Sequence, residues 1–189
     1  MKAIAIFGFV MLAVVLAPAA VIGSQGTIAE GPEITTPSQF KVIAVSKPGG
    51  IELVAPETRV VLSPPHGLSD ADVLKMPAAP DSTQHIFLLI RDQFATKPPG
   101  VLYHLYLDLP PDTKPEKEDR RYIGSLNFFG RTSVAASHNT FVSYDITPLV
   151  RSLAATNRLT AITTVTILPA GMPAKDAEPR IGQVELVVQ

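Results

Sequence analysis

Proline and glycine cut this chain into apolar runs that are too short for long helices. The 189 residues include 18 prolines and 12 glycines. Proline is disfavoured inside helices and central strands, because it lacks an amide hydrogen and fixes φ. Apolar runs of about four to eight residues between such breaks are typical of β-strands. We therefore predict an all-β fold, an antiparallel β-sandwich of about seven to nine strands. The strand-like runs are residues 40–46, 51–54, 59–62, 85–91, 101–109, 122–129, 161–168 and 180–188.

Alternation within these runs predicts which side chains face the core. Successive strand side chains point to opposite faces. In residues 101–109 one face carries Val101, Tyr103, Leu105 and Leu107, and the other carries Leu102, His104, Tyr106 and Asp108. In the last run, Gly182, Val184, Leu186 and Val188 share a face opposite Gln183 and Glu185. Residues 86–90 are apolar throughout, which favours a strand buried on both faces.

One short helix interrupts the strands, over about residues 147–156. Thr147 is the expected N-cap, with Pro148 at the first helical position, where a missing amide hydrogen costs nothing. Four apolar residues then form a stripe at helical spacing, and the pattern ends near Asn157. The stripe consists of Leu149, Val150, Leu153 and Ala154.

The N-terminus predicts export. Met1 and Lys2 precede an apolar segment, residues 3–16, and Ala17-Pro18-Ala19 has the small-residue pattern of a cleavage site. We therefore divide the chain into a signal peptide (1–19), a flexible lead (20–39) and a β-sandwich domain (40–189). The alternative is an uncleaved membrane anchor, since apolar character continues to Ile22 and approaches the ~20 residues that span a bilayer. Both interpretations place the domain outside the cytoplasm, in the periplasm or the extracellular space.

Composition excludes several kinds of function. The chain has no cysteine, so neither a disulfide framework nor a thiolate metal site is possible. A net charge of −1 gives no electrostatic basis for binding nucleic acid. Neither a nucleophile elbow nor a phosphate-binding glycine loop occurs in a suitable context. We therefore expect a protein that is not an enzyme.

The histidines are too few for a coupled dicopper site. Such a site holds each copper through three imidazoles, whereas this chain has four histidines in all. A single metal ion could still use His104, His138 and His66. The competing interpretation is that these are surface or edge histidines with ordinary partners, and it is the one we favour.

Three aromatic residues are candidates for an interaction surface. Phe128 and Phe129 are neighbours, so in a strand one of them points inward and the other outward. Tyr106 lies on the outward face of residues 101–109. Ordinary packing is the simpler interpretation for each of the three.

The second half of the chain carries several short motifs in order. They are Tyr106-Leu-Asp-Leu-Pro110, Ile123-Gly-Ser-Leu-Asn-Phe-Phe-Gly130 and Asp145-Ile-Thr-Pro-Leu-Val150. With these motifs, residues 40–189 resemble the C-terminal β-sandwich domain of tyrosinases and polyphenol oxidases, most strongly after Gly100. Residues 143–146 would occupy the Lys-Phe-Asp-Val motif of the plant enzymes, with Ser143 in place of lysine. The copper domain of those enzymes has no counterpart here.

The resemblance implies a role beside a copper enzyme. In that family the domain packs over the dicopper site, supports folding and holds the enzyme latent. We therefore expect an exported, non-catalytic accessory domain that binds, shields or helps to mature a separately encoded type-3 copper oxidase, with no cofactor of its own. One alternative is a copper-binding or copper-transfer protein. Residues 130–140 keep only His138 where family loops are often histidine-rich, which weakens that alternative. Another is an envelope structural β-sandwich unrelated to copper.

Overall fold

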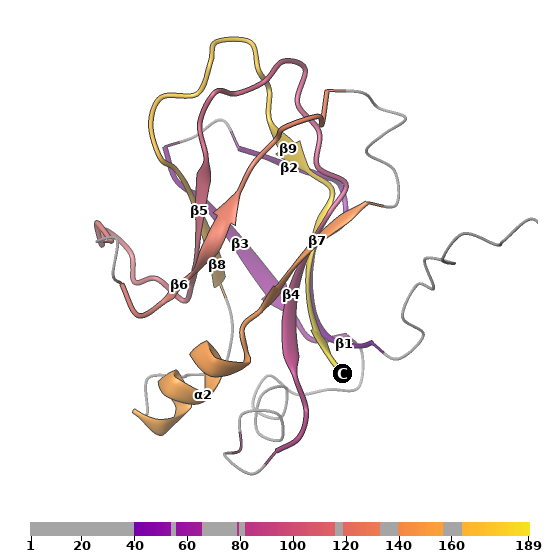
Figure 1. The fold of residues 1–189 in the computed structure, drawn as a ribbon, viewed down its shortest axis with the longest axis vertical. Coiled ribbons are helices and arrows are strands. Elements are labelled where there is room, and N and C mark those ends of the chain that lie inside the picture. Colours follow the sequence, from indigo (N-terminus) through magenta and orange to yellow (C-terminus); the bar gives the residue numbers. More distant parts are fainter. Residues whose placement is uncertain are drawn as a thin grey trace, which may run out of the picture. The chain divides into compact units, whose positions relative to one another are not determined.

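The computed structural model describes residues 40–53, 56–65, 79, 82–115, 119–132, 140–156 and 164–189. Within these residues lie ten strands and one helix (Figure 1). The expected signal peptide and lead, residues 1–39, lie outside the described residues. The elements are β1 (Lys41–Ser46), β2 (Ile51–Glu52), β3 (Thr58–Ser63), β4 (Ile86–Arg91), β5 (Tyr103–Leu107), β6 (Tyr122–Leu126), β7 (Phe141–Asp145), α2 (Thr147–Ala155), β8 (Thr164–Pro169), β9 (Arg180–Ile181) and β10 (Gln183–Val188).

Eight of the strands form one antiparallel sheet that curls into a nearly closed sandwich. Their order is β6-β5-β8-β3-β1-β10-β4-β7, and β2 and β9 form a separate pair. The sheet has two halves, β6-β5-β8-β3 and β1-β10-β4-β7. β3 joins them, because it pairs with β8 along residues 58–61 and with β1 at its last two residues. The all-β, antiparallel sandwich expected from the sequence is confirmed.

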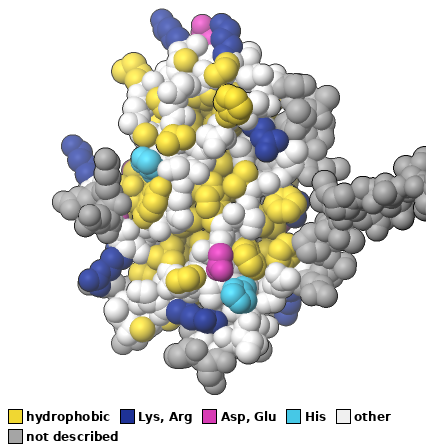
Figure 2. All heavy atoms as spheres, viewed as in Figure 1, with side chains coloured by type: hydrophobic (Ala, Val, Ile, Leu, Met, Phe, Trp, Pro, Cys, Tyr) yellow, Lys and Arg dark blue, Asp and Glu magenta, His cyan; other side chains and the backbone are white. Residues whose placement is uncertain are grey.

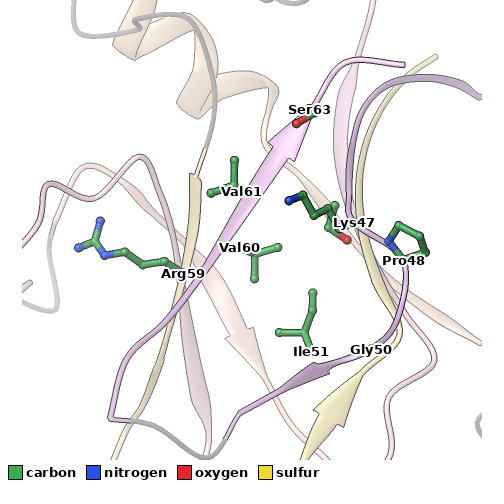
Figure 3. Close-up of a pocket in the computed structure, with 9 residues that line it drawn as sticks. Lys47, Pro48, Gly50, Ile51, Arg59, Val60, Val61 and Ser63 are labelled. Atoms are coloured by element: carbon green, nitrogen blue, oxygen red, sulfur yellow. The ribbon is translucent and has the colours of Figure 1, made fainter. Parts of the chain in front are cut away.

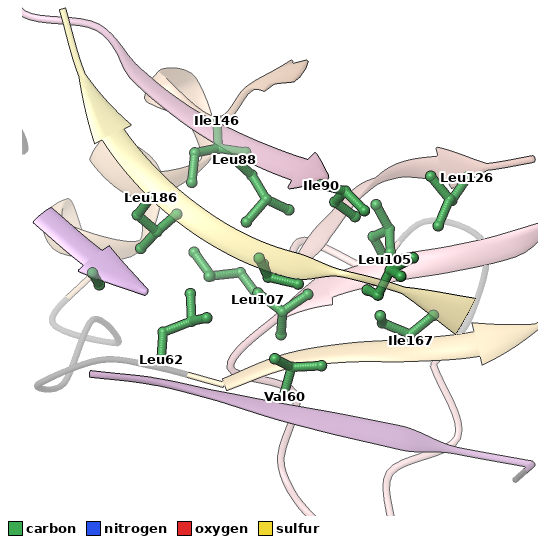
Figure 4. Packing of buried hydrophobic residues seen from close by; sticks show 14 of the residues in the cluster. Val60, Leu62, Leu88, Ile90, Leu105, Leu107, Leu126, Ile146, Ile167 and Leu186 are labelled. Carbon is green, nitrogen blue, oxygen red and sulfur yellow. The ribbon is translucent and has the colours of Figure 1, made fainter. Parts of the chain in front are cut away.

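The core lies between the two halves, and the alternation of residues 101–109 builds part of it. Tyr103, Leu105 and Leu107 of β5 have no exposed surface, as the pattern predicted. Facing side chains come from the other half, among them Leu88 and Ile90 of β4 (Figure 4). β4 is buried at four of its six positions, in agreement with its uninterrupted apolar sequence.

The last predicted strand is divided in two. β9 pairs with β2, whereas β10 pairs with β1 and β4. The break falls at Gly182, where an added Cβ would lie 2.8 Å from the Cβ of Asp92. Asp92 itself has a positive φ of 52°. This close approach of two turns joins segments far apart in sequence, so the periodicity of residues 180–188 alone did not reveal it.

Helix α2 begins differently from the expectation. Thr147 is the first helical residue rather than the N-cap, and Ile146 occupies the cap position without a side-chain hydrogen bond. The Thr147 hydroxyl instead accepts the amide hydrogen of Ile86 at 2.8 Å and ties the helix to β4. Val150 and Leu153 are buried, as the stripe predicted. No helix of the described residues is long and apolar enough to cross a membrane.

Candidate functional site at the β6–β7 seam

The two edge strands of the large sheet, β6 and β7, meet through a side chain instead of a ladder. Gly124 of β6 has no side chain, and the ring of Tyr144 from β7 fills that space: a Cβ built at Gly124 would lie 2.8 Å from Tyr144 Cε1. The Tyr144 hydroxyl donates a hydrogen bond of 2.9 Å to the carbonyl oxygen of Ser125. We call Gly124, Ser125 and Tyr144 the β6–β7 seam.

Burial makes the Tyr144 hydroxyl harder to ionise than an exposed phenol. Removal of the phenol from water, with a smaller contribution from Tyr122, raises the pKa of Tyr144 to about 12. A protonated phenol can donate, whereas a phenolate cannot, so the bond to Ser125 persists across the physiological pH range. The Tyr144 ring and the hydrogen bond from its hydroxyl thus both contribute to closing the seam.

A polar and aromatic cluster covers the outer side of the seam. The Ser125 hydroxyl lies 3.0 Å from His104 Nδ1 and 2.8 Å from the hydroxyl of Tyr122. The Tyr122 ring packs against His104, with centroids 5.8 Å apart, and against Tyr106 at 5.5 Å. One serine therefore connects the outer cluster to the strand edge that Tyr144 holds from within.

Of the three candidate metal ligands, only His104 lies in the described part of the chain. His104 has its Nδ1 beside a serine hydroxyl, and the part of the chain described contains no group of three or more His, Asp or Glu side chains placed to hold a metal ion. His66 and His138 lie outside the described residues.

The residues at the Lys-Phe-Asp-Val position have separate structural tasks. Tyr144 fills the seam, and Ile146 is buried, with its amide bonded to the Ile86 carbonyl. Asp145 Oδ1 accepts the Thr147 amide hydrogen at 2.9 Å, and its Oδ2 lies 3.4 Å from His85 Nδ1. Burial raises the pKa of Asp145, but hydrogen bonds from Thr147 and His85 outweigh it and hold the pKa below its usual value.

A protein-family model covers most of this domain. It is described as a domain of unknown function, DUF7868, and it matches residues 44–189. This chain belongs to the DUF7868 family. No curated protein matches it.

Solved structures of plant polyphenol oxidases match the DUF7868 domain in their C-terminal-domain region. Latent apple tyrosinase matches at 17% identity and a TM-score of 0.47, over 74% of this chain and 27% of that one. Latent aurone synthase, co-crystallised with hexatungstotellurate, matches at 16% identity and a TM-score of 0.47, over 75% and 25%. The DUF7868 chain spans about a quarter of the length of these enzymes.

Of the three aromatic candidates for an interaction surface in this DUF7868 domain, only Phe129 is exposed. Phe128 is 2% exposed and packs edge-on against Tyr103, and Tyr106 is 4% exposed beneath Tyr122. Both are therefore unavailable to a partner, which corrects the expectation for these two residues. Phe129 is 93% exposed. Its amide donates to Asn127 Oδ1 at 3.1 Å, which fixes the turn that presents the ring.

The DUF7868 face that carries the seam is largely uncharged. Figure 2 shows apolar side chains through the middle of this face, with most Lys and Arg side chains toward its outline. Sequence reasoning missed the seam, because only a non-local pairing places Tyr144 over Gly124. The available signal was a glycine inside a strand-like run, which often marks a close approach.

Proposed function

We propose that this DUF7868 protein is an exported accessory domain that binds a separately encoded type-3 copper oxidase and shields or helps to mature it. What supports the proposal is where the motifs of the resemblance lie in the fold. The first starts in the last two residues of β5 and continues beyond it, the second covers β6 and the turn after it, and the third joins β7 to α2. β5 pairs with β6, and β6 meets β7 at the seam, so the three motifs adjoin.

Phe129 is the residue best placed to anchor such a partner. It projects from the turn that follows β6, three residues after that strand ends, and its ring is 93% exposed. Large aromatic side chains that enter a pocket of the partner contribute most of the energy in many interfaces. At the substrate entrance of an oxidase, the phenyl ring would exclude phenolic substrates. This exclusion is what we mean by shielding.

The first prediction tests this anchor. The full chain would be mixed with the type-3 copper oxidase of its own host, and monophenol oxidation and binding would both be measured. We expect the wild-type chain to slow substrate turnover by the mature oxidase. Phe129→Ala should weaken binding about thirtyfold or more, the loss that corresponds to a hot spot of ~2 kcal/mol.

Met172→Ala is the matched control, because Met172 is equally exposed, at 93%, but lies in a different loop. It should leave binding unchanged. Equal losses in both variants would place the contact elsewhere. If the wild-type chain neither binds the oxidase nor changes its activity or its copper loading, the accessory role is wrong and an envelope structural role becomes the better interpretation.

A further inference from the structure

The ladder between β1 and β3 stops after two residue pairs, Val45 with Ser63 and Ser46 with Leu62. Pro48 follows two residues after the end of β1. Proline has no amide hydrogen to donate, so the ladder cannot continue through it. Two glycines with φ of 123° and 79°, at positions 49 and 50, then turn the chain toward β2, which pairs with β9 instead. β1 and β3 therefore separate within the plane of the sheet.

A cavity of about 310 Å³ opens where the strands separate (Figure 3). One side is lined by residues 46–48 with 50 and 51, and the other by residues 59–61 with Ser63. Residues 59–61 are three consecutive residues of β3, so their side chains lie on alternate faces of the sheet. A cavity that touches all three therefore runs along the edge of the strand, in the position that a neighbouring strand would take.

The backbone of Arg59 faces this cavity. The backbone N–H and C=O of Thr164 in β8 point toward β5, because this carbonyl accepts the Asp108 amide hydrogen at 2.7 Å. The backbone groups of successive residues point to alternate edges of a strand. The backbone groups of Val165 therefore point toward β3, where Val165 pairs with Val60. The N–H and C=O of Arg59 consequently point to the other edge. In the described part of the chain no strand pairs with Arg59 on that edge.

The side chains around the cavity add a positive charge and an apolar wall. The ammonium of Lys47 has no ion pair or hydrogen bond among the described residues. The guanidinium of Arg59 is engaged elsewhere, by Glu57 and by the carbonyl of Leu109 at 2.8 Å. Ile51, which is partly buried, points to the cavity from β2. Within the part of the chain that the structure describes, Lys47 is thus the unpaired cation at the opening.

We propose that this cavity binds a short, extended peptide segment that carries an acidic side chain. Its main chain would add to the Arg59 edge of β3 as a strand, the mode known as β-augmentation. Its carboxylate would pair with Lys47, and an apolar side chain would contact Ile51. A volume near the lower limit for ligand sites fits a segment of a few residues.

The test uses the ¹⁵N-labelled full chain and the blocked peptide acetyl-Val-Thr-Val-Asp-Val-amide. We expect saturable shifts of the backbone amide signals of Arg59, Val61 and Gly50 on titration. Replacing the peptide's Asp by Lys should weaken binding about two- to fivefold, the range for an exposed ion pair. Lys47→Glu should reverse that preference. Lys41→Glu, at a lysine that is also exposed and lies at the far end of β1, should not.

Two further measurements separate main-chain recognition from simple charge attraction. Methylating alternate amide nitrogens of the peptide should abolish binding for at least one of the two possible sets, because those nitrogens donate to the strand edge. The proposal is overturned if no saturable shift appears, or if neither methylated set binds more weakly. It is also overturned if inorganic phosphate alone moves the same signals as far. Shifts that depend on protein concentration without peptide would identify a second copy as the occupant and likewise reject it.

Discussion

Gly124 and Tyr144 are a complementary pair at the scale of single residues. Gly124→Ala places a methyl group 2.8 Å from the tyrosine ring, so either the ring or strand β6 must move. We predict that this substitution lowers the free energy of unfolding by about 1–3 kcal/mol, the usual cost of overpacking. Urea denaturation followed by tyrosine fluorescence measures the effect.

Gly171→Ala is the control for this prediction. Its added Cβ would lie 3.5 Å from Val101, an ordinary contact, and stability should change by less than about 1 kcal/mol. If both alanines cost the same, the space at Gly124 is not specific to Tyr144. A double variant, Gly124→Ala with Tyr144→Leu, should recover part of the loss, because a smaller side chain leaves room for the methyl group.

At the scale of elements, Asp145 links the end of β7 to the start of α2. Its pKa is lowered in the folded chain, so the carboxylate contributes stability above its unfolded pKa and loses it as pH falls through the folded value. We predict that wild type is more stable than Asp145→Asn near pH 6, and that the difference shrinks as the pH falls below about 4. Chemical denaturation at a series of pH values checks this. Asp112→Asn, in an exposed loop, controls for loss of one negative charge, and an identical pH dependence in both variants would contradict the prediction.

Some elements could be predicted from the sequence and others could not, for a physical reason. The alternation of residues 101–109 and the apolar stripe of α2 are local patterns, and both are present in the structure. The break at Gly182, the seam at Tyr144 and the hydroxyl bond from Thr147 to β4 depend on segments that meet only after the sheet forms. Phe129 is intermediate: alternation indicated that it or its neighbour would be exposed, but burial of Phe128 against Tyr103 decided which.

At the scale of the whole molecule, the sandwich is closed unequally on its two sides. On one side β3 pairs with both β8 and β1, whereas on the other the described strands β6 and β7 share no ladder and meet through the Tyr144 side chain. We predict that Tyr144→Ala speeds amide hydrogen exchange in β6 and β7 and leaves β10 and β4 protected, because local opening follows the weakest contacts. Tyr144→Phe keeps the ring and should change exchange far less. A uniform increase over all strands would mean that the seam does not open independently.

The place of β10 in the sheet has a consequence for synthesis of the protein. β10 is the last strand along the described chain, yet it lies between β1 and β4, near the middle of the sheet. Until residues 183–188 have left the ribosome, β1 and β4 lack the strand that joins them, and both present unpaired edges to the surroundings. Such edges invite pairing with other chains. If the chain is exported, as we propose, this delay favours the unfolded state that a translocation channel accepts.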